Sequence, residues 1–489
     1  MKIPDFNRTR YFGATLFFGL MAMTARNATD PDLWWHLTNG QRILATGHVP
    51  HTDPFSFTRA GHAWVSHEWL SDIVFYELWK HGGAAALIIF SALITTAGFM
   101  FLYRRCPGKR HWAAAATAIG ALASAASWGV RPQMFTFTLA SLFLLLLEIG
   151  ESHPRVLISI PPLFLLWLNL HAGFALGPAL LLAYAIGILV EAIFGELSWR
   201  QAQPIIVRTV LLVFACLALV PLNPSGAQLY RYPLDTLRSP GMRSFIVEWF
   251  SPDFHQSLYQ PLLLVWLLLI VAICSSRPKG RVLIPLLLTA WASLDAVRHI
   301  PIFALLAVPV IAGSVPKTWL QRGSPEPPPA PICWRSFFGV AVIVLLAVFA
   351  AVKWTSLVGK QQARENELFP RTAVEFLQTN QEPPRAFIYY DWGGYAIWNL
   401  YPRYQVFVDG RADLYGDPLL RQFEDVIQLR TGWNRVLDDW GVQTVLVPPT
   451  SALAQGLLLD THWKTAFSDV QSILLVRDVP MSQDAELLE

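Results

Sequence analysis

The run Asp30-Pro31-Asp32-Leu33-Trp34-Trp35-His36, within the polar segment of residues 27–80, decides how the rest of the chain can be arranged. It directly follows the first hydrophobic segment of the chain, residues 11–26. Carboxylates, histidines and tryptophans concentrated at the end of an apolar segment indicate a place where water meets lipid. The run therefore predicts the loop of a functional site at a membrane surface.

The composition predicts a polytopic membrane protein. Of the 489 residues, 54% are hydrophobic and only 15% are charged, with 20 Trp and 30 Phe. The apolar residues fall in blocks long enough to cross a bilayer, which a single soluble domain would not require. The net charge is only +3 and no basic tract is interleaved with aromatic residues, so nucleic acid is not expected as a partner.

The apolar blocks predict about eleven transmembrane helices. Each is roughly 15–25 residues long, the length needed to cross ~30 Å of hydrocarbon. They begin near Tyr11, Gly83, Trp112, Met134, Val156, Phe174, Pro204, Pro261, Val282, Ile300 and Phe337.

Basic residues predict the orientation, because Lys and Arg in short connections stay on the cytoplasmic side. If the N-terminus is cytoplasmic, alternate connections should be basic, and they are: Arg104, Arg105, Lys109, Arg110; Arg155; Arg200, Arg208; Arg277, Lys279, Arg281; Lys317, Arg322, Arg335. The membrane is expected to be a bacterial inner membrane. The segments on its outer side would then be residues 27–80, residues 223–260 and the region after about Trp354. The first segment fits a cleaved signal peptide or, as we favour, an uncleaved anchor.

The outward connections share chemistry-bearing residues that the inward connections lack. Several are at the ends of predicted helices, where polar groups are costly and tend to be functional. Besides Asp30 and Asp32, they are His36, His67, Glu68, Arg131, Gln133, Asn169, His171, Glu248, Arg298 and His299. Each has a structural alternative, such as a helix cap or a turn, and Arg298 has Asp295 as an alternative partner one turn away. Their collection on one face predicts a substrate-binding site there.

Two amphipathic helices are expected in the first outward loop. Asp30 suits an N-cap and Pro31 the first helical position, which predicts a helix over residues 31–45 that ends at Gly47. Trp34 and Trp35 suit the headgroup zone, although tryptophan there is more often an anchor than a ligand platform. A second helix is predicted over residues 66–80.

The chain changes character after a proline-rich linker at residues 323–331 and the last apolar segment. Short buried strands are predicted at residues 386–390, 405–408, 444–447 and 472–476, with helices at 370–378, 418–429 and 433–440. We therefore divide the chain into a transmembrane domain, residues 1–355, and a small outward-facing α/β domain, residues 356–489.

This architecture, with an acidic first outward loop matched by Asp30-Pro31-Asp32, resembles the C-type superfamily of integral membrane glycosyltransferases. The resemblance covers the whole chain, but few residues carry it. It implies transfer of a sugar from a polyprenyl-phosphate donor, with inversion, to a lipid, glycan or protein acceptor. It also implies a first-loop carboxylate as base or metal ligand, with Mg²⁺ or Mn²⁺ as the candidate metal.

Inverting transfer needs a carboxylate to take the proton of the acceptor hydroxyl, and a cation to stabilise the departing phosphate. We assign Asp32 as the base. Asp30 is assigned as a second catalytic carboxylate or as a metal ligand. Arg131, Arg298 and His299 are candidates for the phosphate, because arginine offers a planar fork matched to its oxygens. The sugar could be a hexose or a pentose.

The C-terminal region contains the motif Tyr389-Tyr390-Asp391-Trp392-Gly393-Gly394-Tyr395, followed by Val408-Asp409-Gly410-Arg411. It loosely resembles the aromatic-Asp-aromatic-Gly motif of the oligosaccharyltransferase catalytic subunit, with an extra glycine. The resemblance implies acceptor binding by Tyr390, Asp391, Trp392, Asp409 and Arg411; a strand-turn-helix packing motif is the alternative.

Two other functions remain open at this stage. A transporter or lipid flippase should carry polar residues in the middle of its spans, lining a path. Glu191 and Asp295 are among the few acidic groups in or near the predicted spans, and they lie toward helix ends. A non-catalytic membrane scaffold predicts no cleft that joins Asp32, Arg131 and Arg298.

Overall fold

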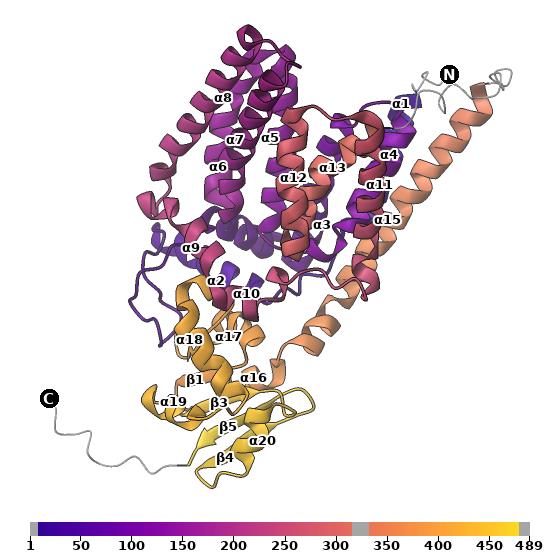
Figure 1. Ribbon diagram of the computed structural model, residues 1–489. Helices are drawn as coiled ribbons and strands as arrows, with labels where there is room; N and C mark the ends of the chain where they lie inside the picture. Colours follow the sequence, from indigo (N-terminus) through magenta and orange to yellow (C-terminus); the bar gives the residue numbers. More distant parts are fainter. Residues whose placement is uncertain (1–7, 315–331, 479–489) are drawn as a thin grey trace.

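The structure is a computed structural model that describes residues 8–314 and 332–478, so the predicted linker at 323–331 lies outside it. Each of the eleven predicted apolar segments forms a helix, and Figure 1 shows these helices gathered in one bundle. They are α1 (Arg8–Thr24), α3 (Trp69–Arg105), α4 (Arg110–Ala123), α5 (Gln133–Ser152), α6 (Ile160–Leu170), α7 (Leu176–Ile193), α8 (Trp199–Leu219), α11 (Gln260–Ser276), α12 (Gly280–Asp295), α13 (Ile300–Gly313) and α15 (Ile332–Leu368).

The bundle is that of an integral membrane protein. Among the described residues, 6 helical stretches are long and apolar enough to cross a bilayer, and three shorter apolar helices accompany them. A helix of 20 residues spans ~30 Å, the thickness of the hydrocarbon layer. The predicted class, a polytopic α-helical membrane protein with a small C-terminal α/β region, is confirmed.

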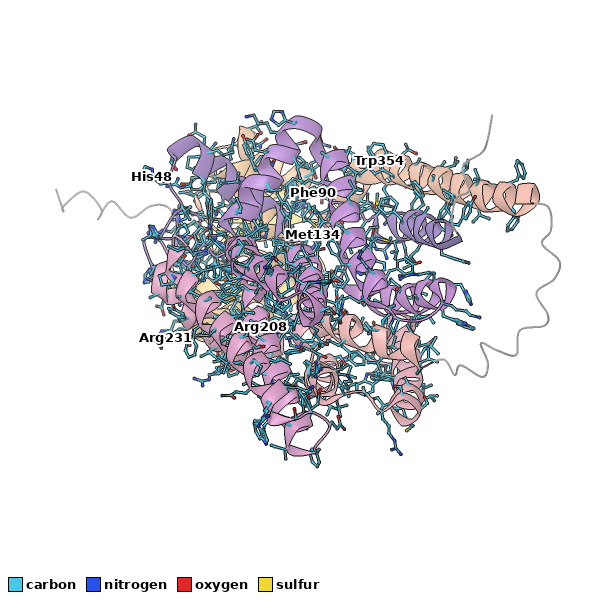
Figure 2. The ribbon with its side chains drawn as sticks, turned by 90° about the horizontal axis from the view of Figure 1, so that it is seen from above. His48, Phe90, Met134, Arg208, Arg231 and Trp354 are labelled. Carbon is cyan, nitrogen blue, oxygen red and sulfur yellow. The ribbon has the colours of Figure 1, made fainter. Side chains whose placement is uncertain are left out.

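The last helix, α15, connects the two parts of the molecule. Figure 1 shows it running obliquely from the far end of the bundle to the C-terminal sheet. Its most apolar stretch is 0% buried, and Figure 2 shows one end of the helix reaching away from the bundle, whereas Trp354 lies against the bundle and its indole N–H donates to the Ala85 carbonyl of α3 at 3.3 Å. Because α15 is continuous to Leu368, the predicted domain boundary at residues 355 and 356 falls inside it.

The C-terminal region contains a mixed sheet of five strands in the order β2-β1-β3-β5-β4. The strand β1 pairs in parallel with β2 and with the central β3, whereas β5 is antiparallel to β3 and β4. The strands are β1 (Arg385–Ile388), β2 (Gln405–Val406), β3 (Thr444–Val447), β4 (Trp463–Ser468) and β5 (Ile473–Arg477). The helices are α16 (Arg371–Thr379), α17 (Gly393–Leu400), α18 (Ala412–Ile427), α19 (Trp433–Asp439) and α20 (Ala452–Leu458).

Two of these elements, the strand β4 and the helix α20, were not predicted. The strand β4 is mostly exposed and therefore lacks the apolar run by which the other strands were recognised. The helix α20 has only 7 residues, too few for a helical period to stand out. The helix α17 follows β1 through the 3₁₀ turn η9 (Tyr390–Trp392), which is the strand-turn-helix arrangement that the sequence offered as the alternative at this motif.

The first outward loop folds into two helical stretches, as predicted. The helix α2 (Leu33–Thr46) ends at Gly47, which takes the left-handed conformation with φ 72°. The next helix starts at Trp69 and is interrupted at Gly83, where the backbone leaves helical geometry and the membrane-spanning part begins. The start of α2 was predicted two residues too early, at residue 31. The Asp30 side chain accepts from the Asp32 backbone N–H (3.0 Å) in a turn that precedes the helix.

Trp34 and Trp35 are buried in protein, so the prediction that they anchor α2 in the headgroup zone was wrong. Trp34 packs edge-on against Trp79, Phe369 and Tyr395. These partners come from α3 and from the C-terminal part of the chain, so α2 is enclosed between the bundle and the sheet region.

The loop after α2 extends the C-terminal sheet. Ser56 forms a parallel bridge with Val406 of β2. The Val406 N–H donates to the Phe55 carbonyl and the Phe57 N–H donates to the Val406 carbonyl, each at 3.2 Å. Two segments about 350 residues apart in sequence thereby share one sheet edge.

The connection at residues 223–260 also lies where the bundle meets the C-terminal sheet region. It contains two short helices, α9 (Tyr232–Arg238) and α10 (Pro240–Phe245), which Figure 1 shows between the bundle and the sheet region. The 3₁₀ turn η6 (Val247–Trp249) follows α10.

Candidate active site

A cavity of about 720 Å³ lies where the ends of the bundle helices, the first outward loop and the C-terminal region meet. Most of the residues predicted to form a site line it, although they come from segments far apart in the sequence. They are Asp30, Asp32, His36, His67, Glu68, Arg131, Gln133, His171, Glu248, Arg298, Tyr390, Asp391 and Arg411.

One wall is the Arg131 cluster, defined as Arg131, Asp30, Asp32 and Glu248. Arg131 precedes α5, and its Nε lies 2.8 Å from Asp30 Oδ2 and its Nη2 lies 3.8 Å from Asp32 Oδ2. Its Nη1 pairs with Glu248 of η6. One guanidinium thus serves three carboxylates, of which Asp32 is the most distant.

The environment of Asp32 increases its basicity. Removal from water, with Asp30 next in importance, raises the pKa of Asp32 to about 6 against the opposing effects of Arg131 and His36. The Trp35 indole N–H donates to its Oδ1 at 3.2 Å and so orients the carboxylate. A carboxylate with these properties is ionised at neutral pH but accepts a proton more readily than an ordinary aspartate.

A second wall is the Glu68 network, defined as Glu68, His36, His67, His171 and Asp72. Glu68 precedes α3, and its carboxylate lies 3.3 Å from Nε2 of both His67 and His171, and 3.6 Å from Nε2 of His36. The other ring nitrogen of His36 lies 2.6 Å from Asp72 Oδ1. Asn39 donates to the second oxygen of Asp72 at 2.6 Å.

The charges of the Glu68 network compensate one another. Burial would favour neutral forms, but the Glu68 carboxylate raises the pKa of His67 to about 9, and the three histidines hold the pKa of Glu68 below its usual range. Burial lowers the pKa of His171 to about 3. The Gly173 N–H donates to His171 Nδ1 (2.9 Å), so the proton of this neutral ring is on Nε2, facing Glu68.

Arg298 lies on a third wall, in the 3₁₀ turn η8 (Val297–His299) before α13. Its guanidinium carbon sits 4.4 Å from the centroid of the Trp249 ring. The alternative partner Asp295 pairs with Arg243 instead, at 3.2 Å. No ion pair involves Arg298 within residues 8–314 and 332–478, so its charge is directed at the cavity without a carboxylate partner.

Gln133 adds a neutral group to the cavity wall. Its Oε1 is buried and has no hydrogen-bond partner in the described part of the chain. A buried acceptor without a donor is costly, and a hydroxyl of a bound molecule could satisfy it.

Four predicted site residues do not line the cavity and support its walls instead. Asn169 accepts from the Trp69 indole N–H at 2.8 Å, and His299 packs edge-on against Trp249. The Trp392 indole N–H donates to the Leu368 carbonyl at 2.8 Å. Asp409 is fully buried and pairs with Arg411, with 2.6 Å from Oδ2 to Nη2.

Other groups at the junction were not predicted as site residues. Asp72 follows Glu68 by four positions on α3, a helical spacing that could have revealed it. Asp413 lines the cavity and Asp53 reaches the buried Arg411, but no local pattern marks either residue. Their partners come from distant parts of the chain.

The donor set does not fit the divalent metal that the sequence resemblance implied. Asp30 is the candidate ligand, but its Oδ2 lies 2.8 Å from Nε of Arg131. A metal ion would have to displace that guanidinium. In the Glu68 network, the Nε2 of His171 carries a proton and has no lone pair for a metal. Among the described residues, no group of three or more His, Cys, Asp and Glu side chains is arranged to hold a metal ion.

The chain is similar in fold to solved membrane enzymes. The Archaeoglobus fulgidus oligosaccharyltransferase in its apo form superposes with a TM-score of 0.52 at 12% identity, covering 91% of this chain and 70% of that chain. ArnT from Cupriavidus metallidurans, bound to undecaprenyl phosphate, has a TM-score of 0.46 at 14% identity, covering 95% and 97%. No protein-family model and no curated protein sequence matches the chain.

The likeness to the oligosaccharyltransferase establishes the fold class. This chain shares the fold of that oligosaccharyltransferase, in line with the architecture that the sequence resemblance implied. At 12% identity the likeness concerns the fold, and the chemistry has to be argued from the cavity.

Proposed function

We propose that the protein is an integral membrane glycosyltransferase that moves a sugar from a polyprenyl-phosphate donor to a hydroxyl of a lipid, glycan or protein acceptor. The observation that carries this proposal is one cavity lined by both a carboxylate of raised pKa, Asp32, and an arginine, Arg298, that pairs with no carboxylate of residues 8–314 and 332–478. Acid–base chemistry and the capture of an anion are the two requirements of inverting glycosyl transfer.

Asp32 acts as the base. As its carboxylate takes the proton of the acceptor hydroxyl, the hydroxyl oxygen bonds to the anomeric carbon. The bond from that carbon to the phosphate oxygen breaks at the same time, and the electron pair leaves with the polyprenyl phosphate. The attack from the opposite face inverts the anomeric configuration. Trp35 and Arg131 hold the carboxylate in place through the contacts described above.

Arg298 is the favoured group for the departing phosphate. Of the other two candidates, Arg131 already serves three carboxylates and His299 does not line the cavity. Stacking on Trp249 orients the Arg298 guanidinium, and its planar fork suits two phosphate oxygens. The cavity beside it is lined by Met242, Phe245, Ile246 and Val247, a surface suited to the first isoprene units of a lipid.

We further propose that the cavity opens on the outer side of a bacterial inner membrane, with the N-terminus in the cytoplasm, because basic residues concentrate in the connections at the opposite end of the bundle. A non-catalytic scaffold predicts no cleft that joins Asp32, Arg131 and Arg298, yet all three line the same cavity. A transporter remains the competing function.

The test is transfer of radiolabelled sugar from a panel of polyprenyl-phosphate sugars, in membranes that contain equal amounts of wild type, Asp32→Asn or Asp253→Asn. Asp253 is exposed and lies outside the cavity, so its substitution is the matched control. We expect Asp32→Asn to lower transfer by about 10²–10⁴-fold, the usual contribution of general base catalysis, and the control to keep wild-type activity. Equal activity of Asp32→Asn and wild type would exclude the base; no transfer from any donor would favour the transporter.

A further inference from the structure

The C-terminal region touches the acidic loop through glycines that have no room for a side chain. A Cβ on Gly410 would overlap the carboxylate of Asp32, its nearest neighbour. A Cβ on Gly394 would come within 2.5 Å of the Pro31 carbonyl oxygen. Neither glycine has a positive φ, so close approach, rather than backbone conformation, requires glycine at both positions.

A buried ion pair fixes this approach. Arg411 follows Gly410 and is only 2% exposed; its Nη1 lies 2.7 Å from Asp53 of the first outward loop and its Nη2 lies 2.6 Å from Asp409. Its guanidinium carbon lies 5.0 Å from the centroid of the Phe55 ring and 4.7 Å from that of the Trp64 ring. All these partners hold Arg411 in the wall, so it is poorly suited to bind an acceptor.

We propose that the turn Asp409-Gly410-Arg411 is a positioning element for the Asp32 carboxylate, which gives the C-terminal region a direct part in the transfer step. This inference rests on the proposed function, because it needs Asp32 as the base. The Gly410 backbone closes one side of the carboxylate, and the Trp35 indole N–H holds Oδ1 on another. The Arg411–Asp53 pair sets the distance between the two chain segments.

A substitution at Gly410 can test the positioning of the Asp32 carboxylate without disturbing the fold. An alanine there meets the end of the Asp32 side chain, whereas an alanine at Gly393 would meet the backbone of Val408 and Asp409. In Gly410→Ala the carboxylate can rotate away while the backbone of both segments stays in place. The variant should therefore displace the base without unfolding the protein.

The experiment compares steady-state transfer by wild type, Gly410→Ala, Gly359→Ala and Asp32→Asn, together with the thermal midpoint of each purified protein. A Cβ on Gly359 of α15 meets nothing within 4 Å, so this variant is the matched control. We expect Gly410→Ala to lower kcat by about 10²-fold, the cost of misplacing a reacting group by about 1 Å, with donor KM and thermal midpoint unchanged. Gly359→Ala should equal wild type.

A second variant, Asp53→Asn, removes the ion pair at nearly constant volume. We expect it to lower kcat as well as the thermal midpoint, because it loosens the interface that Gly410→Ala leaves intact. Wild-type kcat in Gly410→Ala would overturn the positioning role, as would a loss of activity explained entirely by unfolded protein. If Asp32→Asn is as active as wild type, the base assignment fails instead, so the two failures are distinguishable.

Discussion

The Glu68 network and the Arg298 side of the cavity differ in how their charges are compensated. Glu68 is surrounded by three histidines; His36, Glu68, Asp72 and His171 are each 9% exposed or less, and the His67 side chain is 12% exposed. Arg298 stacks on the Trp249 ring, and no carboxylate pairs with it among the described residues. Compensated buried charges hold a structure in place, whereas an uncompensated charge beside a cavity is available to a ligand.

The Arg131 cluster lies between these two extremes. Three carboxylates share one guanidinium there, so the cluster keeps an excess of negative charge, and the carboxylate farthest from Arg131 belongs to Asp32. Burial is the main reason why the pKa of Asp32 rises although an arginine is nearby, and the charge of Asp30 adds to the rise. The cavity thus combines a rigid wall, a basic carboxylate and a free cation.

The largest effect within this comparison is expected for Arg298→Gln. Without the guanidinium, the leaving phosphate loses its proposed electrostatic partner, and kcat/KM should fall by about 10²–10³-fold at little cost in stability. Arg243→Gln is the control, because Arg243 is about half exposed and already paired with Asp295. Transfer kinetics with varied donor concentration measure the effect. Unchanged kcat/KM in Arg298→Gln would mean that a group other than Arg298 stabilises the leaving phosphate.

Glu68→Gln should mainly affect stability. Removing one partner of a buried ion pair leaves the other charges uncompensated and costs about 3 kcal/mol. The exposed Glu77, which faces Lys80 and His81, is the control, because Glu77→Gln should cost under about 0.5 kcal/mol. Thermal unfolding in detergent tests both variants. If the Glu68→Gln protein were stable but inactive in transfer, the Glu68 network would have a role in the reaction rather than in stability.

The two regions should also differ in their response to pH. Transfer should fall as the pH is lowered through about 6, because Asp32 must be ionised to act as a base. Stability should fall at the other end of the scale. The ordinary pKa of 6.5 for His67 is raised to about 9 in the folded protein, so its ion pair with Glu68 is fully present below pH 6.5 and is lost as the pH rises through about 9.

Transfer rates and thermal midpoints, measured across the same pH range, separate the two responses. Asp32→Asn should remove the acid limb of the rate profile and leave the alkaline loss of stability unchanged. A stability profile that does not change between pH 8 and 10, measured on wild type, would contradict the pairing of His67 with Glu68.

The sequence by itself determined the helical bundle and most of the residues that line the cavity of the candidate site. Long apolar blocks must become helices in lipid, because every backbone polar group needs a partner there. Gly83 and Gly47 marked helix boundaries correctly, since glycine adopts backbone conformations that end a helix. Polar residues in alternate connections had to gather at one face of the bundle.

Only the tertiary structure decided which of these residues have compensated charges. Trp34 and Trp35 carry the pattern of a membrane anchor, but the C-terminal region covers them. Arg131, Arg298 and Arg411 are the same residue type, yet one serves three carboxylates, one stacks on a ring and one is buried between two aspartates. Their partners come from distant segments, and local pattern reports only on neighbours along the chain. The fold therefore followed from hydrophobicity, whereas the chemistry of the cavity followed from long-range packing.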